Sequence, residues 1–95
     1  MISNQPFDPL QEAKLNIKAT PNPSSSYFTL HINSNNVSPV QLRVIDQVGR
    51  VIEIRQGVAA NTTLTVGQSY RPGTYFAQVI QHGKQAQLKL VKQNQ

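Results

Sequence analysis

The sequence consists mainly of short runs in which apolar and polar residues alternate, separated by turn residues. Alternation with a period of two places one face of a β-strand against a core and leaves the other face in water. The clearest run is residues 40–46, where Val40, Leu42 and Val44 alternate with polar side chains. Six more strands are predicted at residues 15–19, 27–32, 51–56, 62–66, 74–81 and 84–92.

Seven short strands joined by polar turns predict an all-β fold, a small immunoglobulin-like antiparallel β-sandwich of about seven strands. A purely parallel sheet is excluded, because no connection between the runs is long enough to hold a helix. The chain has no Cys and no Trp, which disfavours a true antibody-type domain. Residues 1–14 lack sustained periodicity and are interpreted as a linker, so the folded domain is placed at residues 15–95.

Two hairpin turns are specified by their residues. His82 and Gly83 form a two-residue connection that suits a primed turn. Gly49 can adopt a positive φ at the end of another short hairpin loop, across which Asp46 and Arg50 can form an ion pair.

The connection between the first two predicted strands is stiffened by proline. Pro21 and Pro23 each lack a backbone donor, and each pushes the preceding residue toward an extended conformation. The sequence therefore predicts a rigid, kinked crossover at this point.

Charge is distributed unevenly along the 95 residues. Nine Lys and Arg residues stand against four Asp and Glu residues, which gives a formal net charge of +5. Residues 71–95 contain Arg71, Lys84, Lys89 and Lys92 and no acid. Such a surplus suits nucleic acid, an anionic membrane surface or an acidic partner, or is simply a solvated cationic face. Nucleic acid is disfavoured, because aromatic residues that would stack on bases fit core positions instead.

The sequence contains few candidate catalytic residues, and their spacing matches no known catalytic arrangement. A domain of this length buries one thin core and is too small for a deep enzyme pocket. His31 is predicted on the polar face of a strand and His82 at a hairpin tip, and neither has metal-ligand or triad partners at a suitable spacing. Gly67, Gly73 and Gly83 each precede a strand, whereas a phosphate-binding glycine loop opens a helix. We expect no catalytic residue, cofactor or metal site.

No segment is predicted to target or span a membrane. Residues 1–14 lack the charged region and the apolar run of a signal peptide, and no run of about 20 apolar residues is present. Any export signal is expected in a longer parent chain.

The strand predicted at residues 74–81 is apolar on both faces. Tyr75, Ala77 and Val79 fill one face, whereas Phe76 and Ile80 place apolar side chains on the other. Either another segment of the chain covers this second face, or it is a contact surface for a partner.

Five stretches of the sequence occur in an order that is typical of one known family. They are an opening strand followed by Pro21, Asn22 and Pro23; a further apolar strand; an alternating strand that enters a D-x-x-G-R turn made by Asp46, Gly49 and Arg50; Gly73, Thr74 and Tyr75 at the start of an apolar strand; and the turn glycine Gly83 before a Lys-rich last strand. In this order they resemble the C-terminal sorting domains of proteins secreted by the type IX secretion system of Bacteroidetes-type bacteria. The resemblance covers residues 15–93. It departs at Tyr70, where Leu is usual, and at Arg71 and Pro72, which exchange the usual order of proline and small polar residue.

The resemblance implies a folded, non-catalytic export signal at the end of a larger secreted protein. Members of this family are recognised in the periplasm and directed across the outer membrane, after which the protein is secreted or held at the cell surface. A sortase-like peptidase commonly cuts in the linker before the domain, which by analogy places the cut within or near residues 1–18. The implied partners are the cargo, the outer-membrane secretion machinery and this peptidase, with no nucleic acid and no direct membrane span.

The candidate recognition residues gather in and beside the carboxyl-terminal hairpin. They are Arg71, Gly73, Tyr75, Phe76, Gly83, Lys84, Lys89 and Lys92. The lysines could dock on an acidic receptor surface, or the last strand could add to a receptor edge by β-augmentation. Alternatively, the lysines protect an exposed edge strand from aggregation. The apolar face of the hairpin, which includes Leu88 and Leu90, is expected to be core.

A second function class stays open at this point, namely an adhesive or carbohydrate-binding immunoglobulin-like or fibronectin-like β-sandwich of a secreted protein. This function would need exposed aromatic side chains on one concave face or loop, and Phe76 and Tyr27 are the candidates. The sorting-domain interpretation is preferred because five ordered stretches favour it.

Overall fold

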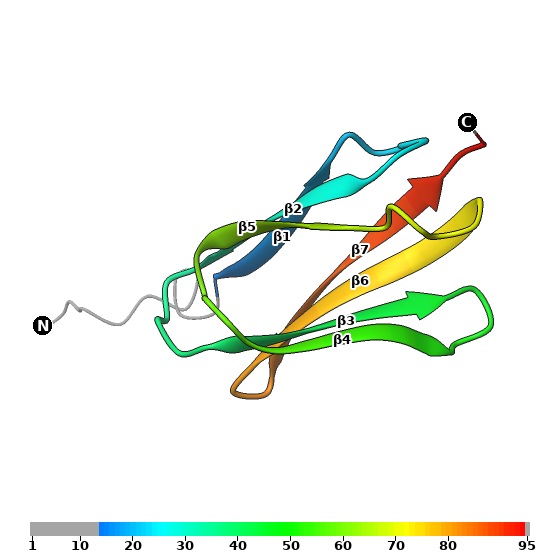
Figure 1. The fold of residues 1–95 in the computed structure, drawn as a ribbon. Coiled ribbons are helices and arrows are strands. Elements are labelled where there is room, and N and C mark those ends of the chain that lie inside the picture. Colours follow the sequence, from blue (N-terminus) through cyan, green and yellow to red (C-terminus); the bar gives the residue numbers. More distant parts are fainter. Residues whose placement is uncertain (1–13, 95) are drawn as a thin grey trace, which may run out of the picture.

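The structure is a computed structural model that describes residues 14–94, and this part of the chain contains seven β-strands and no helix (Figure 1). The strands are β1 (Leu15–Thr20), β2 (Phe28–Ser34), β3 (Val40–Asp46), β4 (Val51–Val58), β5 (Thr62–Val66), β6 (Gly73–Gln81) and β7 (Lys84–Lys92). All seven predicted strands are confirmed, and their bounds differ from the prediction by at most two residues. The predicted linker lies outside the described residues, except for its last residue.

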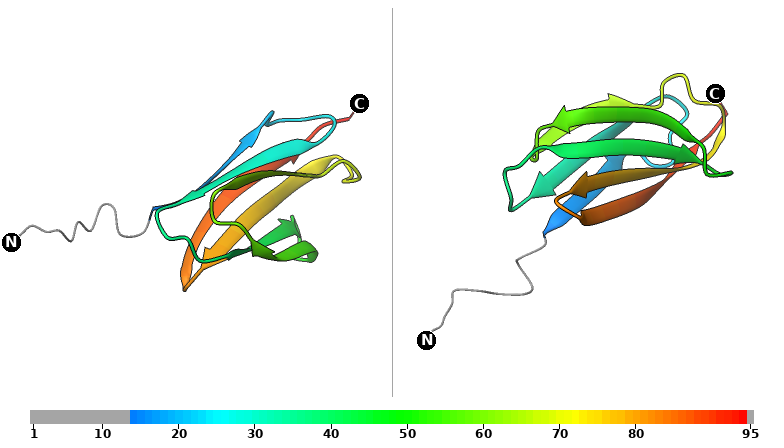
Figure 2. Two further views of the ribbon diagram at one scale, coloured as in Figure 1. Left: turned by 60° about the vertical axis from the view of Figure 1, so that its left-hand side comes forward. Right: turned by 90° about the horizontal axis from the view of Figure 1, so that it is seen from below.

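The strands form two antiparallel sheets, which are the two layers visible in Figure 2. One sheet has the order β1-β2-β5 and the other the order β4-β3-β6-β7. β1 lies alongside β7 at one side of the sandwich, while β4 and β5 are the remaining edge strands. The all-β sandwich is confirmed. The predicted crossover after β1 is wrong, because β1 and β2 pair directly as antiparallel neighbours.

The core is formed mainly by strand side chains that the period of two placed on the inner faces, with Ala60 added from the connection between β4 and β5. The buried hydrophobic residues are Ile17, Phe28, Leu30, Ile32, Val40, Leu42, Val44, Ala60, Val66, Tyr75, Ala77, Val79 and Leu90. Leu88, which was also expected in the core, is only partly buried. Burial of each large side chain contributes roughly 1.5–3 kcal/mol, so this thin layer supplies most of the free energy that holds the sheets together.

The β6–β7 hairpin contains the predicted primed turn. His82 has φ 47° and Gly83 has φ 78°, and a type I′ turn requires positive φ at both central residues. The antiparallel pairing then continues along the whole length of both strands. The turn therefore fixes the register of the last strand.

The β3–β4 turn is held by the predicted pair of Asp46 and Arg50. The Arg50 Nε donates to Asp46 Oδ2 at 2.9 Å, and Asp46 Oδ1 accepts the backbone N–H groups of Val48 and Arg50 at 3.1 and 2.9 Å. Gly49 has the predicted positive φ, at 89°. Desolvation opposes ionisation of Asp46, but hydrogen bonds and charge from Arg50 outweigh it and lower the pKa of this carboxyl.

We predict that Asp46→Asn destabilises the domain at neutral pH but not in acid. A carboxyl whose pKa is lowered by folding stabilises the folded state above its ordinary pKa of about 3.9, and this contribution disappears as the pH falls through the lowered value. Urea midpoints of the wild-type and variant proteins should differ at about pH 7 and converge as the pH falls below the lowered pKa of Asp46. Equal midpoints at neutral pH would contradict the prediction.

Candidate recognition surface

The carboxyl-terminal hairpin, β6 and β7, does not expose every residue that the sequence proposed for recognition. Tyr75 is only 8% exposed, and its hydroxyl donates to the carbonyl of Arg71 at 2.6 Å. Its ring centroid lies 4.8 Å from that of Tyr70. Tyr75 is therefore a core residue that holds the loop before β6, and it offers little surface to a partner.

Phe76 and Ile80 lie on the outer face of the four-stranded sheet, on the side away from the core. Phe76 pairs with Ile45 on β3 and with Lys89 on β7, and Ile80 pairs with Gln85 on β7. Both side chains are half-buried, which is the burial that cross-strand neighbours provide. Part of Phe76 stays accessible, so the outer face remains a candidate contact surface.

Three of the four predicted basic residues are exposed: Arg71, Lys84 and Lys89. Lys84 follows the exposed turn glycine Gly83, and Lys89 lies five residues further along β7. Arg71 precedes Gly73, which pairs with the far end of β7. At about 3.3 Å per residue, these charges are spread along the hairpin rather than gathered at one point.

The fourth basic residue, Lys92, is buried. Its side chain is 6% exposed, and its ammonium donates to the carbonyls of Gly67 and Gln68. The predicted surface position of Lys92 is therefore wrong, because the period of two places it on the same face as Leu88 and Leu90. A buried ammonium that binds two carbonyls ties the end of β7 to the β5–β6 connection.

The Pro21-Asn22-Pro23 segment lies against the outer edge of β7. The Asn22 Nδ2 donates to the carbonyl of Lys89 at 2.7 Å, and its Oδ1 accepts the N–H of Val91 at 3.0 Å. The side-chain amide thus takes the place of a peptide group on a neighbouring strand. The sequence predicted a stiff connection here but gave no indication of this pairing.

Ser24 continues the contact along the same edge. Its N–H donates to the carbonyl of Val91 at 3.0 Å, and its carbonyl accepts the N–H of Gln93 at 2.8 Å, which forms a short parallel bridge. Together, Asn22 and Ser24 occupy the edge of β7 from Lys89 onward. A receptor strand cannot add along this part of β7 while the domain is folded.

We predict that Asn22→Ala loosens the end of β7 without unfolding the domain. Loss of two hydrogen bonds should cost about 1–2 kcal/mol, and the Val91 amide should exchange with solvent faster, because its acceptor is removed. Native-state hydrogen exchange and urea unfolding measure both effects.

The control for this prediction is Asn16→Ala, which removes an exposed side chain from β1. It should leave exchange at Val91 unchanged. If Asn22→Ala also left that exchange unchanged, the assigned pairing would be wrong.

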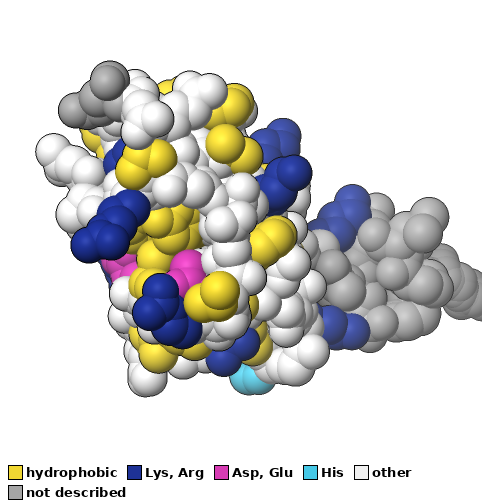
Figure 3. Space-filling view, turned by 90° about the vertical axis from the view of Figure 1, so that its right-hand side faces the viewer, with side chains coloured by type: hydrophobic (Ala, Val, Ile, Leu, Met, Phe, Trp, Pro, Cys, Tyr) yellow, Lys and Arg dark blue, Asp and Glu magenta, His cyan; other side chains and the backbone are white. Residues whose placement is uncertain are grey.

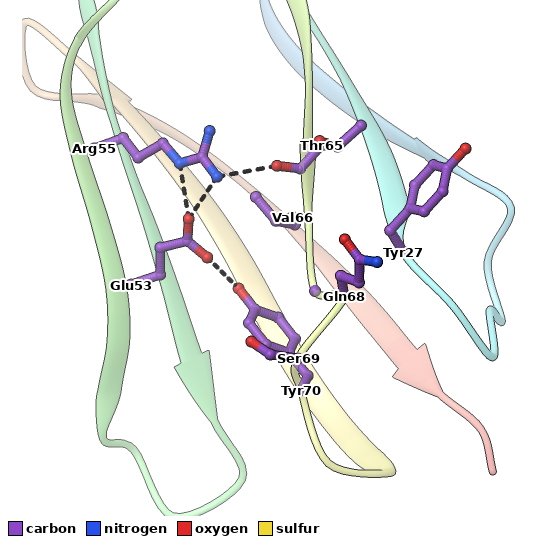
Figure 4. Close-up of a pocket in the computed structure, with 9 residues that line it drawn as sticks. Tyr27, Glu53, Arg55, Thr65, Val66, Gln68, Ser69 and Tyr70 are labelled. Atoms are coloured by element: carbon purple, nitrogen blue, oxygen red, sulfur yellow. Dashed lines mark hydrogen bonds and ion pairs between the residues drawn. The ribbon is translucent and has the colours of Figure 1, made fainter. Parts of the chain in front are cut away.

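A second polar cluster lies between β4, β5 and the loop before β6 (Figure 4). The Arg55 Nε donates to Glu53 Oε2 at 2.7 Å, and its Nη2 donates to the carbonyl of Thr65 at 3.0 Å. The Tyr70 hydroxyl donates to Glu53 Oε1 at 2.6 Å. Burial and the neighbouring Glu53 carboxylate raise the pKa of Tyr70, because both disfavour a phenolate. No sequence pattern predicted this cluster, because Tyr70 and Glu53 lie 17 residues apart in the chain.

The cluster lines an open pocket of about 600 Å³, with Tyr27 on the other side. Because Glu53 binds both Arg55 and Tyr70, its carboxylate is engaged on both oxygens and serves as a structural link. Phe76 does not line this pocket. The structure therefore does not bring Tyr27 and Phe76 together as the adhesive interpretation requires.

The histidines lie apart from both clusters. The His31 Nε2 lies 3.0 Å from Thr20 Oγ1 on the neighbouring strand, and His82 lies at the exposed hairpin tip. Among residues 14–94, no group of three or more His, Cys, Asp or Glu residues is placed to hold a metal ion. The described part of the chain also has no helix with the length and apolarity to cross a membrane.

The arrangement of strands and motifs has a counterpart among known protein families. A family model described as the secretion system C-terminal sorting domain matches residues 18–93. The chain belongs to this family, the type IX secretion C-terminal sorting domains. The match begins inside β1 and ends one residue beyond β7, so it spans nearly the whole sandwich. A search of curated proteins found no match.

Membership in the sorting-domain family confirms the resemblance carried by the five ordered stretches. A sorting domain implies a cargo protein, the type IX secretion machinery and export toward the cell surface or the extracellular space. Sorting domains of this family are in general non-catalytic, and the polar clusters described above have structural roles.

Proposed function

We propose that this domain is a folded, non-catalytic sorting signal. The type IX machinery recognises it and carries the larger cargo protein from the periplasm across the outer membrane. The family match over residues 18–93 carries this proposal. The structure supports this proposal. A signal that must be recognised whichever cargo protein precedes it has to fold through its own contacts. These strands do so, because they bury a core of their own.

Recognition by the machinery is assigned to exposed side chains along the terminal hairpin. Arg71, Lys84 and Lys89 supply exposed positive charge, and Phe76 supplies an accessible apolar side chain. Exposed charges along a rigid hairpin favour steering toward an acidic receptor surface. Tyr75, Lys92 and the turn glycines act indirectly in this proposal, because they fix the shape that presents these side chains.

Removal of the domain by a sortase-like peptidase is proposed to occur before the sandwich. Analogy with the family placed the cut within or near residues 1–18. Leu15–Thr20 pairs with β2 along its whole length, and peptidases act on unpaired, accessible backbone. Bonds on the amino-terminal side of Leu15 are therefore favoured.

We expect that residues 1–95, fused behind a periplasm-directed fluorescent protein, cause its export from a type IX-competent host. Fluorescence in the medium and on the cell surface is compared with that retained in the periplasm. The same fusion in a host without the secretion machinery is the control and should stay inside. Retention in both hosts would overturn the proposed function.

Charge reversal distinguishes recognition by the lysines from edge protection. We expect that Lys84→Glu with Lys89→Glu reduces export of the fusion at least about tenfold, because two charges that face an acidic receptor become repulsive. A glutamate side chain, like a lysine side chain, prevents an exposed strand edge from pairing with another chain, so the variant should stay soluble.

The matched control is Lys14→Glu with Lys18→Glu, which makes the same change in net charge at two exposed positions in and beside β1. Export of this control should equal that of the wild type. Equal loss of export in the two double variants would show that only the net charge matters, and unchanged export of the soluble hairpin variant would favour edge protection.

A further inference from the structure

A small hollow lies where the start of β1 meets the turn between β6 and β7. It has a volume of about 190 Å³, and Lys14, His82 and Lys84 line it together with the polar residues Ser34 and Asn36. β1 lies alongside β7, and Figure 1 and Figure 2 show that β1 begins near the tip of this hairpin. Packing of the two sheets therefore brings Lys14 to the two basic side chains at the turn.

Asp46 and Glu53 are the acids among residues 14–94, and both lie away from the hollow. Asp46 pairs with Tyr75 of β6. Glu53 is level with Ala77, and the turn begins only after Gln81. At about 3.3 Å per residue, each acid is more than about 10 Å from the turn, which exceeds the Debye length of about 8 Å. Figure 3 shows the opposite end of the sandwich, where acidic side chains lie among those of Lys and Arg. Within the described part of the chain, the positive charges of the hollow thus have no neighbouring counter-charge.

Hydrogen bonds of a buried side chain fix the wall of the hollow. Gln81 is 4% exposed, and its Nε2 donates to the carbonyls of Asn36 and Ser38 at 3.0 and 2.6 Å. Its Oε1 accepts the Ser34 hydroxyl at 2.7 Å. The Asn36 Oδ1 accepts the N–H of Ser38 at 2.8 Å, which leaves the Asn36 amide nitrogen as a donor. The loop after β2 is therefore held against the end of β6 before any ligand binds.

We propose that this hollow binds a phosphate group, carried by a soluble phosphate compound or by a lipid headgroup at a membrane surface. A phosphate monoester carries a charge of about −1.5 to −2 at pH 7, which the ammonium groups of Lys14 and Lys84 balance. Its oxygens accept hydrogen bonds from these groups, from His82 and from the Asn36 amide. A carboxylate has one charge and two oxygens, so it uses only part of these donors. The site shares Lys84 with the recognition surface, but the inference goes beyond sorting and does not depend on it.

The first probe is inorganic phosphate, titrated at constant ionic strength into the ¹⁵N-labelled chain of residues 1–95. We expect saturable amide shifts that are largest at residues 34–36 and 82–84. Acetate at the same ionic strength should bind at least about tenfold more weakly, because it offers less charge and fewer acceptor oxygens. Shifts that do not saturate, shifts centred elsewhere, or equal binding of acetate would overturn the proposal.

The test variant is Lys14→Gln with Lys84→Gln, which removes both ammonium groups. Phosphate binding should weaken at least about tenfold, because two charge-assisted hydrogen bonds are lost. The matched control is Lys18→Gln with Lys89→Gln, which makes the same change in net charge at exposed positions outside the hollow and should bind like the wild type. Thermal unfolding checks that both variants stay folded. Equal weakening in the two variants would overturn the proposal, because only the net charge would then matter.

Vesicles distinguish the two sources of the phosphate group. The chain is sedimented with vesicles of phosphatidylcholine that contain phosphatidic acid, whose headgroup is a phosphate monoester, and with vesicles of phosphatidylcholine alone. Binding that needs phosphatidic acid and is lost in the Lys14→Gln, Lys84→Gln variant assigns a lipid headgroup. Binding of inorganic phosphate without vesicle binding assigns a soluble phosphate compound. These measurements use the purified chain, whereas export is measured in the host, so failure to bind phosphate does not bear on the sorting function.

Discussion

The pairing of Asn22 with the edge of β7 is the interaction on which the presentation of the terminal hairpin depends. A last strand with a bare edge would be free to pair with other chains, and its register would be held on one side only. Here the amide of Asn22 and the backbone of Ser24 supply hydrogen bonds on the second side of β7 from Lys89 onward. The end of the hairpin is therefore held on both sides, which agrees with the proposed recognition of its outward side chains.

Two polar contacts reinforce a core that is thin by necessity. Lys92 fastens the end of β7 to the β5–β6 connection, and the cluster of Glu53, Arg55 and Tyr70 links β4 to β5 and to the same connection. A hydrogen bond to a charged group that is shielded from water, as at the buried Lys92, contributes roughly 1.5–3 kcal/mol, whereas the more exposed Arg55–Glu53 pair contributes about 1 kcal/mol at most. These polar contacts thus link the two sheets beside the apolar core.

Sequence reasoning succeeded where a local rule decides the outcome. The seven strands, the positive φ of Gly49 and of the His82-Gly83 turn, and the Asp46–Arg50 pair each follow from residues that are neighbours in the chain. It failed for Lys92, where lysine was assigned to the surface by its charge although the period of two placed it beside Leu90. It also missed the contacts of Asn22 and of Tyr70, whose partners lie 67 and 17 residues away.

The sequence by itself determined the strands, their inner faces, the turns and the family, because these depend on periodicity, on glycine and on motifs that are read in order along the chain. Only the tertiary structure decided which basic residues reach water and which strand edges remain open. Those outcomes depend on how the two sheets are placed together, since Lys92 meets the carbonyls of Gly67 and Gln68, and Asn22 meets β7, only after packing. The same packing leaves β4 exposed, because no other segment among residues 14–94 pairs with its outer edge.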